Sequence, residues 1–213
     1  MKRSPRLIGA LAVLSLSATT LAACGETGAA EPTSPPTTVA TTQVTEEPTT
    51  VKPTVPPNDV LYPHPVPEMP PEAYEHSVLG AQAFTVYFLE TYAYAMSIRD
   101  AQPLKDIMLP ESEFLIAVTD NIDWLNETDS YYLGYHFNDM VVNGTLQGGQ
   151  HPEAEFGTQV TINIPEYTYV DGESGVQDVV PAERYLGAAE VVWRDGWVVS
   201  QGDFVEYSEV YNE

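Results

Sequence analysis

Residues 69–213 of the amino-acid sequence predict an α+β domain, with helices first and antiparallel strands after them. Between residues 69 and 127 apolar side chains recur at the spacing of helices, and after Asp129 they recur at every second residue, the spacing of strands. The tripeptide "RDG" at 194–196 separates "AEVVW" from "WVVSQ" and indicates a β-hairpin. We therefore expect three helices followed by about four to six strands, with the long first helix held in the curl of the sheet.

The N-terminal residues 1–23 have the pattern of a secretory signal peptide. Lys2, Arg3 and Arg6 precede the apolar run "LIGALAVLSLSATT", which is shorter than the roughly 20 apolar residues that span a bilayer. "LAAC" at 21–24 resembles the lipobox of bacterial lipoproteins, in which the cysteine receives a diacylglycerol and often an acyl chain such as palmitate. The resemblance implies that residues 1–23 are removed and that Cys24 anchors the protein on the extracytoplasmic face of the cell membrane. The alternative is an ordinary secretory signal that contains a cysteine by chance.

The composition changes after Cys24. Residues 24–68 are rich in Thr and Pro and contain almost no large apolar side chain before Val60, Leu61 and Tyr62. Such a segment buries too little apolar surface to offset the entropy of ordering, so we expect a disordered linker that lifts the domain off the membrane. Since Cys24 is the single cysteine of the chain, no internal disulfide forms and the domain depends on its hydrophobic core.

The domain is strongly acidic. Residues 69–213 contain 25 acidic side chains and four basic ones, and the whole chain has a formal net charge of -23. The resulting field repels nucleic acids and anionic lipids, so we expect no nucleic-acid partner. The charge is interpreted first as a means of solubility, and recognition of a cationic partner is the alternative.

Three helices are expected before residue 128. The first spans residues 69–100, with Pro70 and Pro71 in its first turn, and carries two apolar stripes that indicate packing on two sides. The stripes consist of Ala81, Phe84, Phe88, Tyr92 and Ala95, and of Ala83, Tyr87, Tyr94 and Ile98. A short second helix over residues 100–109 has Asp100 as its expected cap. A third covers residues 110–127, and its expected inward positions are Phe114, Leu115, Val118, Ile122 and Leu125.

Strands are expected from residue 131 onward. Residues 131–146 alternate loosely between apolar and polar side chains, and residues 157–170 place Val160, Ile162 and Ile164 on one face. A turn with the sequence "DGES" then leads into the segment that contains the hairpin.

This order of elements resembles the nuclear transport factor 2-like (ketosteroid-isomerase-like) cone, in which a bent sheet wraps a long first helix. The chain is also similar to an uncharacterised actinobacterial lipoprotein domain family in its lipobox, its Thr/Pro-rich stalk and the motifs "MPPEA", "YAYAMSIRDAQPL" and "WRDGWVVSQ". These motifs mark structure, and the family brings no established activity. Its members usually carry a close cysteine pair after the second helix, but "LPESEFL" has none, so any role of that pair is absent here.

Enzymes of the cone superfamily place carboxylate, tyrosine or histidine groups in their pocket. A desolvated carboxylate acts there as a general base, and a tyrosine hydroxyl donates to a developing oxyanion. The candidates in this sequence are Tyr87, Tyr92, Tyr94, Tyr135, His136 and Asp139. We favour places in the core or near a strand end for them, because no nucleophile elbow, phosphate-binding glycine loop or metal-ligand spacing accompanies them. We expect no metal and no cofactor.

Two classes of function remain. The favoured one is a non-enzymatic binding or scaffold module of the cell envelope, whose partner is an envelope protein or a small apolar ligand. The alternative is a small cone enzyme, an isomerase, dehydratase or hydrolase acting on an apolar substrate. A pocket plugged by aromatic rings favours binding, and a deep pocket with a carboxylate beside a tyrosine favours the enzyme. The expected pocket-lining residues are Phe84, Phe88, Tyr92, Trp124, Tyr135 and Trp193.

Overall fold

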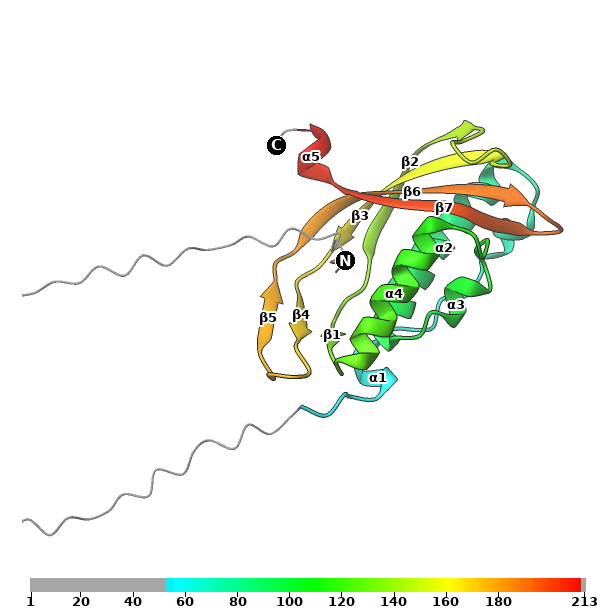
Figure 1. Cartoon of the computed structure of the whole chain (residues 1–213). Coiled ribbons are helices and arrows are strands. Elements are labelled where there is room, and N and C mark those ends of the chain that lie inside the picture. The colour runs from blue at the N-terminus through cyan, green and yellow to red at the C-terminus, as the bar shows by residue number, and fades with distance from the viewer. Residues whose placement is uncertain (1–52, 212–213) are drawn as a thin grey trace, which may run out of the picture. The chain divides into compact units, whose positions relative to one another are not determined.

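The computed structural model describes residues 53–211, which form two antiparallel sheets and the helices beside them (Figure 1). The predicted signal peptide, Cys24 and the Thr/Pro-rich residues up to 52 lie outside the described residues. The helices are α1 (Asn58–Leu61), η1 (Pro71–Tyr74), α2 (Val78–Ile98), α3 (Gln102–Lys105), α4 (Glu113–Glu127) and α5 (Tyr207–Tyr211). The strands are β1 (Tyr131–Leu133), β2 (Asn138–Gln147), β3 (Phe156–Ile164), β4 (Tyr167–Val170), β5 (Gln177–Val180), β6 (Glu183–Trp193) and β7 (Trp197–Glu206).

The larger sheet has four strands in the order β2-β3-β6-β7, and the smaller has three in the order β1-β4-β5. The chain passes between the sheets three times, from β1 to β2, from β3 to β4 and from β5 to β6, and Pro165 and Pro181 lie at the second and third of these points. Proline has no N–H to donate to a ladder, so it interrupts a strand that the apolar pattern alone would continue. The residues from 131 to 206 therefore contain seven strands, more than the sequence predicts.

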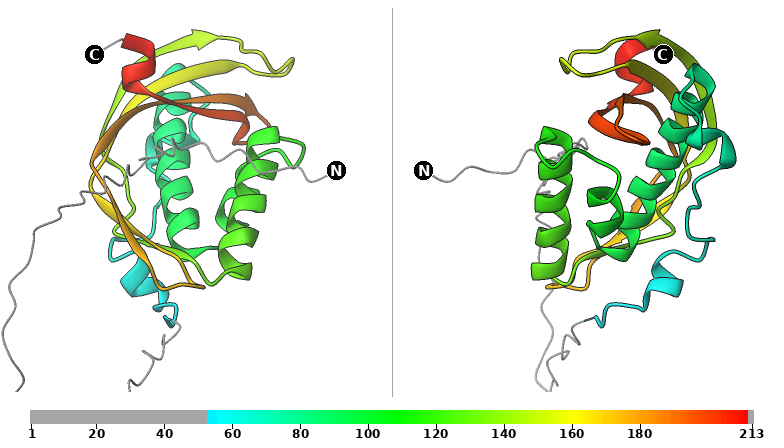
Figure 2. Two further views of the ribbon diagram at one scale, coloured as in Figure 1. Left: turned by 60° about the vertical axis from the view of Figure 1, so that its left-hand side comes forward. Right: turned by 90° about the vertical axis from the view of Figure 1, so that its right-hand side faces the viewer.

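The central helix, α2, lies on the concave side of the larger sheet and contacts all four of its strands, with α4 beside it (Figure 2). Phe84 and Phe88 of the first predicted stripe are fully buried, and Tyr87 and Tyr94 of the second are half-buried. The helix is thus packed on two sides, as its sequence predicts, and the α+β class is confirmed.

The start of α2 differs from the prediction. Residues 71–74 form a 3-10 turn and Glu75 is extended, so the α-helix begins only after Ser77. The Ser77 Oγ accepts a hydrogen bond from the Gly80 N–H at 3.0 Å and caps the helix. A Cβ at Gly80 would lie 2.0 Å from the Glu75 carbonyl oxygen, so glycine is required where the chain folds over the helix start. The expectation of one continuous helix from Met69 is therefore wrong.

Several other predicted elements are confirmed. The "RDG" turn joins β6 to β7, and Trp193 pairs with Trp197 across it. Helix α4 buries the predicted positions Phe114, Leu115, Val118, Ile122 and Leu125. Strand β3 buries Val160, Ile162 and Ile164.

The second predicted helix is only partly confirmed. It covers Gln102–Lys105 and not residues 100–109, because Met108 pairs with Val199 of β7, and its N-cap residue is Ala101, although the Asp100 Oδ1 accepts a hydrogen bond from the Gln102 N–H at 2.9 Å.

Residues 53–70, called the strap below, pack against the rest of the described chain. Leu61 of α1 is 1% exposed and clusters with Tyr131 of β1 and Val170 of β4. The ring of Tyr62 meets that of Tyr94 edge-on, with centroids 5.2 Å apart.

The strap corrects the predicted boundary between linker and domain. The expected linker of residues 24–68 ends too late, because ordered chain begins before Met69. The physical reason is that Leu61 and Tyr62 bring apolar surface that is buried on docking, although the surrounding composition is that of a linker.

Candidate functional site

Aromatic side chains fill the space between α2, α4 and the larger sheet. We call this group the aromatic interior; its members are Phe84, Phe88, Tyr92, Phe114, Phe137 and Phe204. The Tyr92 ring centroid lies 4.9 Å from that of Phe204 and 5.6 Å from that of Phe114. Phe88, one turn earlier on α2, is 0% exposed and lies 5.9 Å from Phe114. The rings are close enough for aromatic pairing and pack as a core.

Three further tyrosines extend the aromatic interior toward the smaller sheet. Tyr135 is buried, and its hydroxyl interacts with that of Tyr92. The Tyr132 and Tyr167 rings lie 5.5 and 5.0 Å from the Tyr135 ring. Burial raises the pKa of Tyr135 well above its usual value, and burial together with Glu183 raises the pKa of Tyr167 to about 12. These phenols stay protonated at neutral pH, where they donate hydrogen bonds and do not act as bases.

The structure separates Tyr135 from Asp139, the pair that would best suit an enzyme. Tyr135 is buried beside Tyr92, whereas Asp139 is exposed at the start of β2. Alternation from Phe137, which packs on the core, would turn Asp139 back to the core side, but the bulge between Asn138 and Val141 interrupts the alternation and leaves Asp139 exposed. The predicted set therefore does not bring an acid and a base together.

Trp124 and Trp193 do not fill the interior, contrary to the prediction. Trp124 is 37% exposed, and its ring stacks on that of Tyr169 at 6.5 Å. It follows the inward position Ile122 by two residues, which places it about 200° around the helix. Trp193 lies at the end of β6, where its ring stacks on that of His76 at 4.5 Å.

The remaining predicted candidates, Tyr87, Tyr94 and His136, face the strap. The His136 ring centroid lies 4.1 Å from that of His64. Tyr87 and Tyr94 line a pocket of about 200 Å³ together with residues of the strap. Burial, with a smaller contribution from His136, lowers the pKa of His64. These side chains hold the strap.

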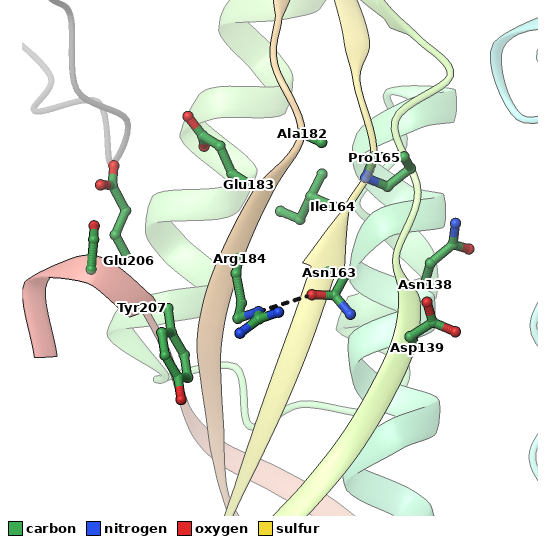
Figure 3. Close-up of a pocket in the computed structure, with 11 residues that line it drawn as sticks. Asn138, Asp139, Asn163, Ile164, Pro165, Ala182, Glu183, Arg184, Glu206 and Tyr207 are labelled. Atoms are coloured by element: carbon green, nitrogen blue, oxygen red, sulfur yellow. Dashed lines mark hydrogen bonds between the residues drawn. The ribbon is translucent and has the colours of Figure 1, made fainter. Parts of the chain in front are cut away.

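A pocket of about 660 Å³ lies where β2 begins, β3 ends, β6 begins and β7 runs into α5 (Figure 3). We call it the outer pocket. A row of polar side chains crosses it, one from each of these neighbouring elements: Asn138, Asn163, Arg184 and Tyr207. The strand register builds the row, because Asn138 pairs with Asn163 and Asn163 pairs with Arg184. Asn163 lies between the buried Ile162 and Ile164, so alternation turns it away from the core.

Arg184 occupies the centre of this row. Its Nε donates a hydrogen bond to the Asn163 Oδ1 at 3.2 Å, and its guanidinium carbon lies 5.1 Å from the centroid of the Tyr207 ring. These two contacts orient the guanidinium plane. Three acidic residues also line the pocket. Asp139 is exposed at its edge, whereas the register places Glu183 and Glu206 on the opposite face of the sheet, beside Tyr185. A guanidinium, two amides and an exposed carboxylate suit a polar, charged ligand.

The outer pocket contains none of the predicted pocket-lining residues, and Asp139 is the only predicted candidate that reaches it. One signal was available in the sequence, namely the rarity of basic side chains. Residues 69–213 contain four basic and 25 acidic residues, and Arg184 is one of the four. The position of that cation could not be found without the register of β2, β3 and β6.

The part of the chain that the structure describes contains neither a metal-binding cluster nor a membrane-spanning helix. Within residues 53–211, no three His, Cys, Asp or Glu side chains are grouped as a metal site would require. None of the helices in the same range combines the length and the apolarity needed to cross a bilayer.

Comparisons with known proteins give a family and two distant structural likenesses. The chain is similar to the crystal structure of the intermembrane-space region of the chloroplast protein ARC6, at 16% identity and a TM-score of 0.47, covering 62% of this chain and 99% of that one. It is also similar to an uncharacterised protein with a cystatin-like fold from Caulobacter vibrioides, at 14% identity and a TM-score of 0.37, covering 63% and 95%. No curated protein matches the sequence. Residues 53–201 match DUF6318, a family of unknown function, and the chain belongs to that family.

Proposed function

We propose that this protein is a cell-envelope lipoprotein, held on the extracytoplasmic face of the membrane by lipid on Cys24, and that its domain is a non-enzymatic binding module. The basic and apolar leader followed by "LAAC" supports the anchor. The Thr/Pro-rich residues after Cys24 support a tether between membrane and domain. The motifs shared with actinobacterial lipoproteins support the same origin for this chain.

The observation that carries binding over catalysis is the filled aromatic interior. A cone enzyme needs that space for its substrate, but Tyr92, Phe114 and Phe204 occupy it with centroid separations of 4.9 to 5.6 Å. The long α2 on the concave side of a curved sheet supports a nuclear transport factor 2-like cone, here closed by its own side chains.

The partner is an envelope protein or a small ligand that reaches the outer pocket. The apolar ligand expected from the sequence has less support, because the apolar space is packed with rings and the outer pocket is lined by charged and amide groups. Binding through polar groups at the surface needs no movement of the core.

A turnover assay tests the non-enzymatic proposal. The full-length protein is incubated at high concentration with the small molecules of a cell-envelope extract, and the extract is followed by mass spectrometry over time. We expect compounds to be retained by the protein without chemical change. Conversion of any compound, fast with the native protein and lost in a Tyr135→Phe variant, would contradict the proposal.

One observation favours the enzyme as second candidate. The Tyr185 hydroxyl donates to the Glu183 Oε2 at 2.8 Å, and Glu183 lines the outer pocket. Burial, together with this bond, raises the pKa of Tyr185. A carboxylate beside a tyrosine is the pairing a general base would use. In the turnover assay this candidate predicts conversion that a Glu183→Gln variant abolishes.

The anchor has its own test. Mass spectrometry of the N-terminus should find a lipid-modified Cys24 as the first residue, and a Cys24→Ser variant should leave the membrane fraction. Cleavage at another position, or an unmodified thiol, would rule the anchor out.

A further inference from the structure

Arg184 differs from Arg99 and Arg194, the other arginines of residues 53–211, in that its terminal N–H groups donate to no protein group. Arg99 donates hydrogen bonds to the Leu125 and Ser130 carbonyls, and Arg194 forms an ion pair with Glu153. Among residues 53–211, Arg184 forms no ion pair, and its terminal guanidinium nitrogens make no hydrogen bond. An oriented guanidinium with free N–H groups in a pocket is a receptor for a carboxylate.

The surroundings of Arg184 exclude a simple anion as the ligand. The domain carries 25 acidic and four basic residues, and its field repels molecules with net negative charge. At the edge of the outer pocket, the exposed Asp139 adds a carboxylate to the single guanidinium. A ligand that pairs with both the guanidinium and a carboxylate of the pocket carries one carboxylate and one cationic group, and so has no net charge.

Asp139 lies at the edge of the outer pocket in a left-handed backbone conformation. Its φ is 46°, in a region that aspartate, like glycine and asparagine, adopts more readily than other residues. The register of β2 against β3 shifts between Asn138 and Val141, so a bulge places Asp139 there. Asp139 is exposed at this bulge, so its carboxylate is open to a ligand.

We propose that the outer pocket binds a zwitterionic ligand of amino-acid or short-peptide chemistry. Its carboxylate is held by the free N–H groups of Arg184, beside the Asn163 amide that is bonded to Arg184, and its ammonium group is held by Asp139 two strands away on β2. The pocket volume of about 660 Å³ lies in the range of small-molecule sites and suits a ligand of two or three residues. This inference rests on the proposed binding function and adds the class of ligand.

Calorimetric titration of the mature chain carrying Cys24→Ser, with three forms of one peptide, tests the proposal. The forms are trialanine, trialanine amide without the carboxylate, and N-acetyl-trialanine without the ammonium group. We expect trialanine to bind and each blocked form to bind at least about tenfold more weakly, since each loses a charge-assisted contact. Equal binding of all three forms, or no saturation by trialanine at about 10 mM, would overturn the proposal.

Two arginine variants locate the site. Arg184→Gln should weaken trialanine binding at least about tenfold and remove the preference for trialanine over its amide, because only the carboxylate contact is lost. Arg194→Gln is the matched control and should leave both affinities unchanged, with thermal unfolding confirming that each variant is folded. If trialanine binds the Arg184→Gln variant as tightly as the native protein, the zwitterion inference is overturned. It is also overturned if the native protein binds uncharged maltotriose and Arg184→Gln abolishes that binding. These results are independent of the turnover assay, which alone decides between module and enzyme.

Discussion

The two faces of the larger sheet serve opposite purposes. On the concave face, Ile162 and Ile164 pack into the core with the aromatic interior, and on the other face Asn163, between them in the same strand, belongs to the polar row of the outer pocket. Phe137 and Asn138 divide in the same way at the start of β2. One face is closed by rings and the other is lined by charge. The comparison indicates that the concave face supplies stability and the outer face supplies recognition.

The largest effect is expected from Phe88→Ala in the aromatic interior. Loss of this fully buried ring should lower the free energy of unfolding by about 3–5 kcal/mol, because it leaves a cavity that the rigid neighbours fill only in part. Urea unfolding measures the change. Tyr74→Ala is the matched control, and since Tyr74 is 67% exposed its effect should stay within about 0.5 kcal/mol. An unchanged stability for Phe88→Ala would remove the concave face from the core.

A smaller loss is expected at the strap. Leu61→Ala should lower the free energy of unfolding by about 2 kcal/mol, the low end for a buried leucine, because its cluster with Tyr131 and Val170 is small. Val60→Ala, at the exposed neighbouring position, should have almost no effect. If the two variants unfold alike, the strap is a linker after all.

Alkaline pH should destabilise the domain through the buried tyrosines beside the aromatic interior. The pKa of Tyr135 is raised by burial and that of Tyr167 is raised to about 12, so the unfolded chain loses these protons more readily than the folded one. Stability is therefore complete below about pH 10, the usual tyrosine value, and falls as the pH rises above it. Urea unfolding at a series of pH values measures the slope. A Tyr167→Phe variant should show a shallower slope, and identical slopes would contradict the assignment.

The smallest effect concerns the contact of His64 with His136. Burial lowers the pKa of His64, so the undocked strap binds the proton more readily and docking weakens as the pH falls below about 6.5. The other groups near this contact are Tyr62, Tyr94 and Glu90, and Glu90 acts on Tyr62. Amide exchange of the strap should be faster at acid pH than at neutral pH. The difference should vanish in His64→Phe, and a difference that persists there assigns the effect to another group.

The sequence could predict those elements whose side chains follow a regular period. The inward positions of α4, the buried face of β3 and the "RDG" hairpin depend on local spacing, and the structure has them as expected. The start of α2 depends on Ser77 and on the close approach of Gly80 to Glu75, which no periodicity reports. The strap depends on Leu61, one apolar side chain in a segment with the composition of a linker.

The candidate site was harder to predict than the fold. The aromatic stripe of Phe84, Phe88 and Tyr92 points to the interior, but a stripe does not show whether the space beyond it is hollow or filled. The outer pocket joins residues from five elements between positions 138 and 208, and only strand register brings Asn163 beside Arg184. Neither residue belongs to a sequence motif.

Chemical-shift mapping tests the central claim, that ligands meet the outer face and not the concave one. Amide and aromatic NMR spectra of the mature chain carrying Cys24→Ser are recorded with increasing trialanine. We predict concentration-dependent shifts at Asn138, Asn163 and Arg184, with the ring signals of Phe88 and Tyr92 unchanged. Shifts confined to those rings would contradict the account, because they would show a ligand entering the interior that the structure presents as filled.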